Sequence, residues 1–114
     1  MFAVIYRFKL KPTQEKQYIK CWNEIANYFS TERGAVGSCL HKGEDGLWVA
    51  YSRWPDRQTR DASWPIGEGI NQSLPPHIQD AIQYMVEIKE HNSSLQQYDE
   101  ICLDVVEDKL LGVK

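Results

Sequence analysis

Two side chains of this sequence are suited to moving and holding a proton, the imidazole of His77 and the phenol of Tyr6. His77 directly follows Pro75 and Pro76 at the expected start of a helix, where the helix dipole disfavours an imidazolium and keeps the ring neutral. A neutral imidazole can accept a proton, and a phenol can donate a hydrogen bond to the oxyanion that forms. We therefore name His77 as a candidate base and Tyr6 as a candidate oxyanion donor. Two alternatives stay open, a surface histidine at a helix start and a packed tyrosine ring.

The aromatic residues, which include four tryptophans, could form the walls of a ligand pocket. Trp54 ends an expected strand and is assigned to the core, because large aromatic rings dominate small cores. Trp64 stands beside a stretch rich in glycine and proline, so a pocket wall and a simple hydrophobic plug both remain open for it. Arg60, four residues earlier, could stack on its indole ring. The candidate ligand-binding rings, expected on the side of a sheet that faces the helices, are Trp64, Trp22, Phe8 and Tyr84.

Patterns that would indicate a bound cofactor or metal are missing from the sequence. It has no His-Glu-x-x-His motif, no closely spaced cysteine pair and no complete dinucleotide fingerprint, so we expect neither a metal nor a cofactor. His41 is assigned a structural or partner-facing role, and His91 a role at a helix end. Several acidic residues lie near the C-terminus, and we interpret them as charges that protect a strand edge. They are Asp99, Glu100, Asp104, Glu107 and Asp108.

The composition describes one domain over residues 1–114, with a net charge of −3 that gives no reason to expect a nucleic-acid partner. No stretch approaches eighteen apolar residues, so no membrane span is expected, and the N-terminus alternates instead of forming a signal sequence. The three cysteines, Cys21, Cys39 and Cys102, are odd in number and widely spaced. They favour a reducing compartment, and we expect a cytoplasmic protein.

The first elements that position these residues are a strand and a helix. Alternating apolar residues predict a strand from Phe2 to Lys11, ended by Pro12. Thr13 is the expected N-cap of a helix that reaches about Glu32 and is followed by Gly34 as its C-terminal glycine. The apolar stripe predicted for this helix comprises Ile19, Trp22, Ile25, Ala26 and Phe29.

The remaining elements follow from turn signals and periodicity. Two strands, 36–43 and 47–54, flank an Asp-Gly turn, and Asp56 can cap a short helix over 57–64. Residues 65–76 lack periodicity and predict a lid or a pocket rim. Ser73 is a possible cap for a helix that fades near His91, and a last strand covers 101–106. This order predicts an α+β, ferredoxin-like split βαβ fold.

One face of the predicted sheet is left without helices. On the first strand it carries Ala3, Ile5, Arg7 and Lys9, a half-apolar set that an identical partner commonly buries. We therefore expect a homodimer. The alternative is a monomer with a solvated sheet face.

Three segments together resemble a known family. VIYRFKLKP running into an amphipathic helix, RGAVGSCLHKGEDG, and LWVAYSRWPD are similar to the antibiotic biosynthesis monooxygenase superfamily of dimeric α/β barrels, over about residues 2–64. The resemblance implies a pocket between sheet and helices, lined by Trp64. Haem-degrading members also need an asparagine on the first strand and a helical histidine about ten residues after that tryptophan. Tyr6 and Leu74 stand at these places and His77 lies three residues further on, so haem degradation is not expected.

Two functions follow as hypotheses. The resemblance implies a cofactor-independent monooxygenase that oxidises a small phenolic or polyketide-like aromatic compound, with His77 and Tyr6 in the chemical roles. The alternative is a non-catalytic dimeric α/β barrel that binds a small ligand, because the sequence presents no clear acid–base pair.

Overall fold

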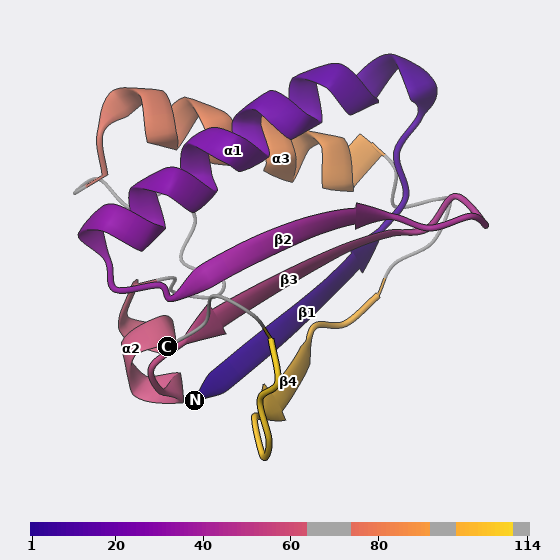
Figure 1. Ribbon diagram of the computed structural model, residues 1–114. Coiled ribbons are helices and arrows are strands. Elements are labelled where there is room, and N and C mark those ends of the chain that lie inside the picture. The colour runs from indigo at the N-terminus through magenta and orange to yellow at the C-terminus, as the bar shows by residue number, and fades with distance from the viewer. Residues whose placement is uncertain (64–73, 92–97, 111–114) are drawn as a thin grey trace.

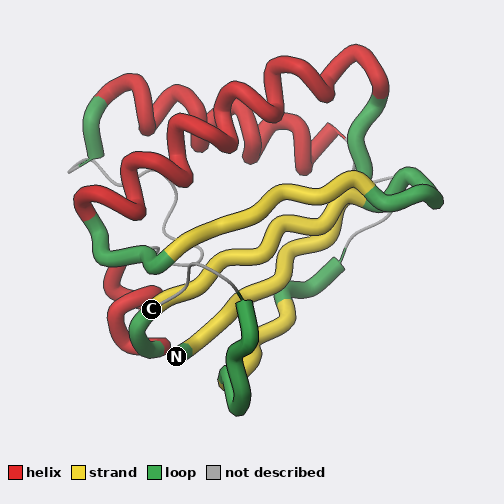
Figure 2. Tube along the Cα trace, viewed as in Figure 1, coloured by secondary structure: helices red, strands yellow, loops and turns green. Residues whose placement is uncertain are grey.

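A computed structural model of the chain describes residues 1–63, 74–91 and 98–110. It has one four-stranded antiparallel sheet in the order β2-β3-β1-β4, with the long helices over one face (Figures 1 and 2). This strand order and the antiparallel pairing confirm the ferredoxin-like α+β prediction. In chain order the elements are β1 (Phe2–Phe8), η1 (Pro12–Gln14), α1 (Glu15–Glu32), β2 (Gly37–Lys42), β3 (Trp48–Trp54), α2 (Arg57–Ser63), α3 (Pro76–His91) and β4 (Ile101–Asp104).

Strand β1 is the central strand that carries Tyr6 and Phe8. Its even-numbered residues face the helices, and its register with β3 places Phe2 opposite Trp54 and Phe8 opposite Trp48. The strand ends at Phe8, three residues before the predicted end. Trp48 is the first residue of β3 after the β2–β3 turn, so the residues beyond Phe8 have no β3 partner in the ladder.

Helix α1 begins and packs differently from the prediction. Thr13 lies within the 3-10 turn η1 and is not the N-cap, which is Gln14. The buried stripe is Tyr18, Cys21, Ile25 and Phe29, whereas Ile19 is 38% exposed and Trp22 is half-buried. The buried face is therefore rotated by about one residue from the predicted stripe, which turns Ile19 and Trp22 toward β2.

The turns behave as the sequence predicted. Gly34 follows α1 with a φ of 81°, a left-handed conformation that glycine adopts without a steric penalty. Gly46 has a φ of 85° in the turn between β2 and β3, where the N–H of Leu47 donates to Asp45 Oδ1 at 3.0 Å. The turn at Gly34 connects α1 to β2, and the turn at Gly46 connects β2 to β3 in a hairpin.

The core lies between the sheet and the helix pair. Trp54 is 5% exposed and packs edge-on against Phe29, with 6.3 Å between ring centroids, so its assignment to the core is confirmed. Helix α3 contributes Ile78, Ala81 and Ile88 to the buried residues. The predicted cap Ser73 lies outside the described residues.

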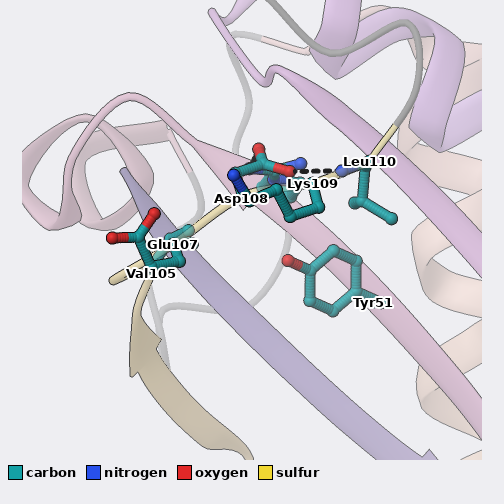
Figure 3. Close-up of a pocket in the computed structure, with 7 residues that line it drawn as sticks. Tyr51, Val105, Glu107, Asp108, Lys109 and Leu110 are labelled. Carbon is teal, nitrogen blue, oxygen red and sulfur yellow. Dashed lines mark hydrogen bonds and ion pairs between the residues drawn. The ribbon is translucent and has the colours of Figure 1, made fainter.

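The sheet face that points away from the helices, called the outer face below, is not simply open. Ala3 and Arg53 lie on it in paired positions, yet they are only 1% and 4% exposed. The last predicted strand pairs over Ile101–Asp104 only, and residues 105–110 then run across the outer face of β1 and β3 (Figure 3). The chain therefore covers one end of the face that was expected to be solvated or covered by a partner.

Candidate functional site

The most deeply buried charge in the described structure is the guanidinium of Arg60, whose side chain is 0% exposed. Arg60 comes from α2, a short helix capped as predicted by Asp56, whose Oδ1 accepts the N–H of Thr59 at 2.7 Å. Arg60 Nη2 donates to the Tyr6 hydroxyl at 3.0 Å and also to the Glu100 carboxylate. Its Nη1 donates to Asp61 Oδ1 at 3.1 Å. We call Tyr6, Arg60 and Glu100 the arginine cluster.

Three parts of the chain meet in the arginine cluster. Tyr6 comes from the middle of β1, Arg60 from α2, and Glu100 from the residue before β4. Cys102 adds a thiol that donates to Glu100 Oε1 at 3.6 Å. Burial alone would lower the pKa of Arg60, but its hydrogen bonds with Glu100 and Tyr6 outweigh that effect and raise it. The guanidinium therefore stays cationic, and a positive charge is held beneath the helices.

The Tyr6 hydroxyl has the properties of a hydrogen-bond donor at neutral pH. Burial raises its pKa above the ordinary value, and the hydrogen bond and charge of Arg60 only partly offset this. The hydroxyl therefore keeps its proton. Because its oxygen already accepts from Arg60, the proton remains available to a ligand oxygen. Arg60 Nε adds a buried N–H that has no acceptor in the described structure.

A groove of about 450 Å³ opens between α1 and the β2–β3 hairpin on the same side of the sheet. Phe8 lies behind it, with its ring stacked on Trp48 at 6.3 Å between centroids and against Tyr18 at 4.8 Å. Since Tyr6 and Phe8 are successive positions on one strand face, the arginine cluster lies about 7 Å along β1 from this aromatic wall. The groove is lined by Ile19, Trp22, Asn23, Ser38, Cys39, Leu40, Lys42 and Trp48.

The structure places the predicted site residues in different surroundings. Tyr6 and Phe8 share one face of β1, and Trp22 lines the same groove as Trp48, on whose ring Phe8 stacks. Tyr84 on α3 is half-buried against the core, and burial raises its pKa. The His77 side chain is exposed at the start of α3, and within the described residues it forms no hydrogen bond. Trp64 and most of the predicted lid, 65–73, lie outside the described residues.

Two members of the arginine cluster were missed as functional residues. Arg60 was considered only as a partner for Trp64, and Glu100 only as an edge charge. A helical period was the available signal, because Arg60 and Ser63 are three residues apart and both are buried on one face of α2. No local pattern indicates Glu100, since its partner lies 40 residues away in the sequence.

The described part of the chain contains neither a cluster of metal ligands nor a helix that could span a membrane. No group of three or more histidine, cysteine, aspartate or glutamate side chains there is close enough to hold a metal ion. None of the described helices combines the length and the hydropathy that crossing a bilayer requires.

Comparison with known proteins gives a family match and a set of structural neighbours. The family model described as antibiotic biosynthesis monooxygenase matches residues 1–63. The structure of Rv0793 from Mycobacterium tuberculosis superposes with a TM-score of 0.63 at 18% identity, covering 94% of this chain and 96% of that one. A crystal structure of an antibiotic biosynthesis monooxygenase gives 0.60 at 20% identity, covering 94% and 100%.

A neighbour with lower sequence identity is a conserved protein from Methanosarcina mazei Go1, with a TM-score of 0.64 at 10% identity, covering 90% of this chain and 89% of that one. At such identities the structural neighbours support the fold alone. No curated protein matches the chain.

Proposed function

The chain belongs to the antibiotic biosynthesis monooxygenase family, and from this premise we propose that it is a cofactor-independent monooxygenase acting on a small phenolic or polyketide-like aromatic compound. The observation that carries the proposal is the hydroxyl of the half-buried Tyr6, which faces the helices and is held by the cationic Arg60. A phenolic substrate that loses a proton becomes an anion, and a polarised buried donor stabilises it.

The chemistry needs few protein groups. An activated CH₂ group of the substrate gives up a proton, and the resulting carbanion adds molecular oxygen. The peroxide that forms loses water and leaves a carbonyl, so that one oxygen atom enters the product and the other leaves as water. The protein has to accept the first proton, hold the adjacent phenolate and keep bulk water away from the anion.

The roles of individual residues are part of the proposal. Tyr6 donates to the developing phenolate, and Arg60 is the positioning residue that holds Tyr6 through a hydrogen bond of 3.0 Å. His77, at the start of α3, is the proposed base. The proposed walls of the binding site are Trp22, Phe8, Tyr84 and Trp64.

We also propose that the protein is a homodimer, associated through its outer face. At the edge of the part that residues 105–110 cover, Ile5, Tyr51 and Ile101 form a half-buried row across three neighbouring strands, and Leu103 nearby is 38% exposed. This apolar row supports association with an identical copy. All three cysteines are free, which supports the expectation of a cytoplasmic protein.

A second candidate function is non-catalytic binding of a small aromatic ligand. One observation favours it: Glu100, the carboxylate beside Tyr6, is already bound to Arg60 and to the Cys102 thiol. With His77 exposed, no uncommitted base stands next to Tyr6 among the described residues. Such a site would hold a phenol by the same donor without removing its proton.

Oxygen consumption separates the two functions. The purified protein is given anthrones and hydroxylated naphthalenes, and uptake of oxygen with formation of the quinone is measured. Tyr6→Phe keeps the ring and removes the donor, so kcat should fall by about 10²-fold or more. Tyr28→Phe, a half-buried tyrosine on α1, is the matched control and should retain activity.

His77→Ala tests the proposed base and should lower kcat by about 10²-fold or more, because the substrate proton then has no acceptor at that place. If the wild-type protein binds these compounds and consumes no oxygen with any of them, the enzyme proposal is wrong and the binding function stands.

A further inference from the structure

A second buried arginine, Arg53, lies on the outer face of β3. Its side chain is only 5% exposed. One of its nitrogens, Nη2, binds the Asp108 carboxylate, while Nε and Nη1 are buried and have no acceptor in the described structure. A buried N–H without a partner is costly, because it loses its hydrogen bond to water and gains none in return. Arg53 therefore has N–H donors, on Nε and Nη1, that could bind an additional acceptor.

The geometry of Asp108 explains why these donors have no acceptor among the described residues. Its Oδ2 contacts Arg53, but its Oδ1 accepts the N–H of Leu110 at 2.9 Å. The carboxylate therefore meets the guanidinium through one oxygen and one nitrogen. The strongest arginine–carboxylate contact uses two parallel hydrogen bonds. In the arrangement that the structure shows, Asp108 makes one contact with Arg53 and uses its other oxygen to cap Leu110.

Arg53 is one of the residues that line a hollow of about 350 Å³ between the outer face and residues 105–110, which Figure 3 shows in close-up. Tyr51, Val105 and Leu110 supply apolar surface there, and Lys109 supplies a second cation. The charges of Arg53 and Lys109 are balanced by Glu107 and Asp108, which also line the hollow. A carboxylate ligand is therefore favoured most where it can replace Asp108 on the guanidinium.

We propose that Arg53 is the centre of a binding site for small carboxylates that carry an apolar body, and that Asp108 occupies this site in part. The ligand's carboxylate forms the paired hydrogen bonds with the guanidinium that Asp108 does not form, and its apolar body lies against Tyr51 and Leu110. The site is on the opposite face of the sheet from Tyr6, so it is independent of the proposed oxidation.

Titration with benzoate tests the site, with benzamide as a neutral probe of the same shape. Binding is measured by calorimetry, and the backbone amide signal of Leu110 is followed by NMR because its partner is Asp108. Benzoate should bind about tenfold more tightly than benzamide, since only the carboxylate forms charge-assisted paired bonds. Equal affinity for the two probes, or no displacement of the Leu110 signal, would overturn the proposal.

Variants identify the residues involved. Asp108→Asn removes the internal competitor and should tighten benzoate binding by about threefold or more, whereas Asp104→Asn, an exposed aspartate on β4, should leave it unchanged. Arg53→Gln should abolish binding, and Tyr6→Phe should not affect it.

Lys109→Gln should weaken benzoate binding by about twofold to fivefold, as expected for an exposed cation. It provides a test even if Arg53→Gln fails to fold. Unchanged or weaker binding by Asp108→Asn would contradict the proposal.

Discussion

The two faces of the sheet each bury an arginine, and they use it differently. Arg60, under the helices, donates to Tyr6, Glu100 and Asp61. Arg53, on the outer face, donates through one nitrogen to Asp108. Both carboxylate partners in the C-terminal part of the chain are about a quarter exposed, at 27%. Burial alone therefore does not make a charge structural, because the number of N–H donors that already have an acceptor decides how many remain for a ligand.

The largest expected difference between the two faces is in stability. Arg60→Met leaves Glu100 and Tyr6 without their partner inside the structure, and it should lower the free energy of unfolding by about 3 kcal/mol. Arg53→Met removes a cation that has two nitrogens without an acceptor and leaves Asp108 near solvent, so it should cost less than about 1 kcal/mol. Urea denaturation of both variants measures the difference. Equal losses would contradict the distinction between the two arginines.

The next effect concerns Tyr6 within the arginine cluster. Tyr6→Phe removes one hydrogen bond to Arg60 and should lower the free energy of unfolding by about 1 kcal/mol. The control Tyr28→Phe should change it by less than about 0.5 kcal/mol, because Tyr28 is on the surface of the core. Thermal melting followed by circular dichroism measures both. A Tyr6→Phe variant as stable as the control would mean that Arg60 does not depend on the hydroxyl.

The proposed dimer provides a third test of the outer face. Ile5→Lys places a charge in the middle of the half-buried row without touching the arginine cluster, so it should convert a dimer into monomers at micromolar concentration. Sedimentation velocity gives the mass directly. If the wild-type protein sediments as a single copy, the dimer proposal is wrong.

The smallest effect is that of acid on the outer face. The hydrogen bond from Arg53, followed by that from Leu110, lowers the pKa of Asp108 below the ordinary aspartate value. A carboxylate with a lowered pKa stabilises the folded form fully above the unfolded value of about 3.9 and loses that contribution as the pH falls through the folded value. Residues 105–110 should therefore loosen on acidification below about pH 4.

Hydrogen exchange of the Leu110 amide checks this loosening. Exchange that accelerates equally in wild type and in Asp108→Asn would contradict the role of Asp108.

Much of the fold could be predicted because it rests on short-range signals. The alternation around Val4, the Asp-Gly turn at Gly46 and the Asp56 cap each depend on residues close in sequence. The errors concern features that depend on contacts between elements distant in the sequence. Strand β1 ended early because its β3 partner ended, and the buried stripe of α1 was rotated because packing against the sheet and α3 selects the face.

The candidate site was predictable in part for the same reason. Tyr6 and Phe8 follow from the alternation of one strand, and Trp54 follows from its place at a strand end. The arginine cluster was not predictable, since Tyr6 and Arg60 are 54 residues apart and Arg60 and Glu100 are 40 apart. A charged residue in a polar stretch gives no sign that it will be buried until its partners are known.

The sequence by itself determined the family, the order of the elements and the face of each strand, because periodicity, turn residues and caps act within a few positions of one another. Only the tertiary structure decided which charges are buried, which carboxylate each arginine meets and where the chain's own C-terminal part covers the sheet. These are contacts between residues far apart in the sequence, and their energies depend on desolvation that exists only once the chain has folded.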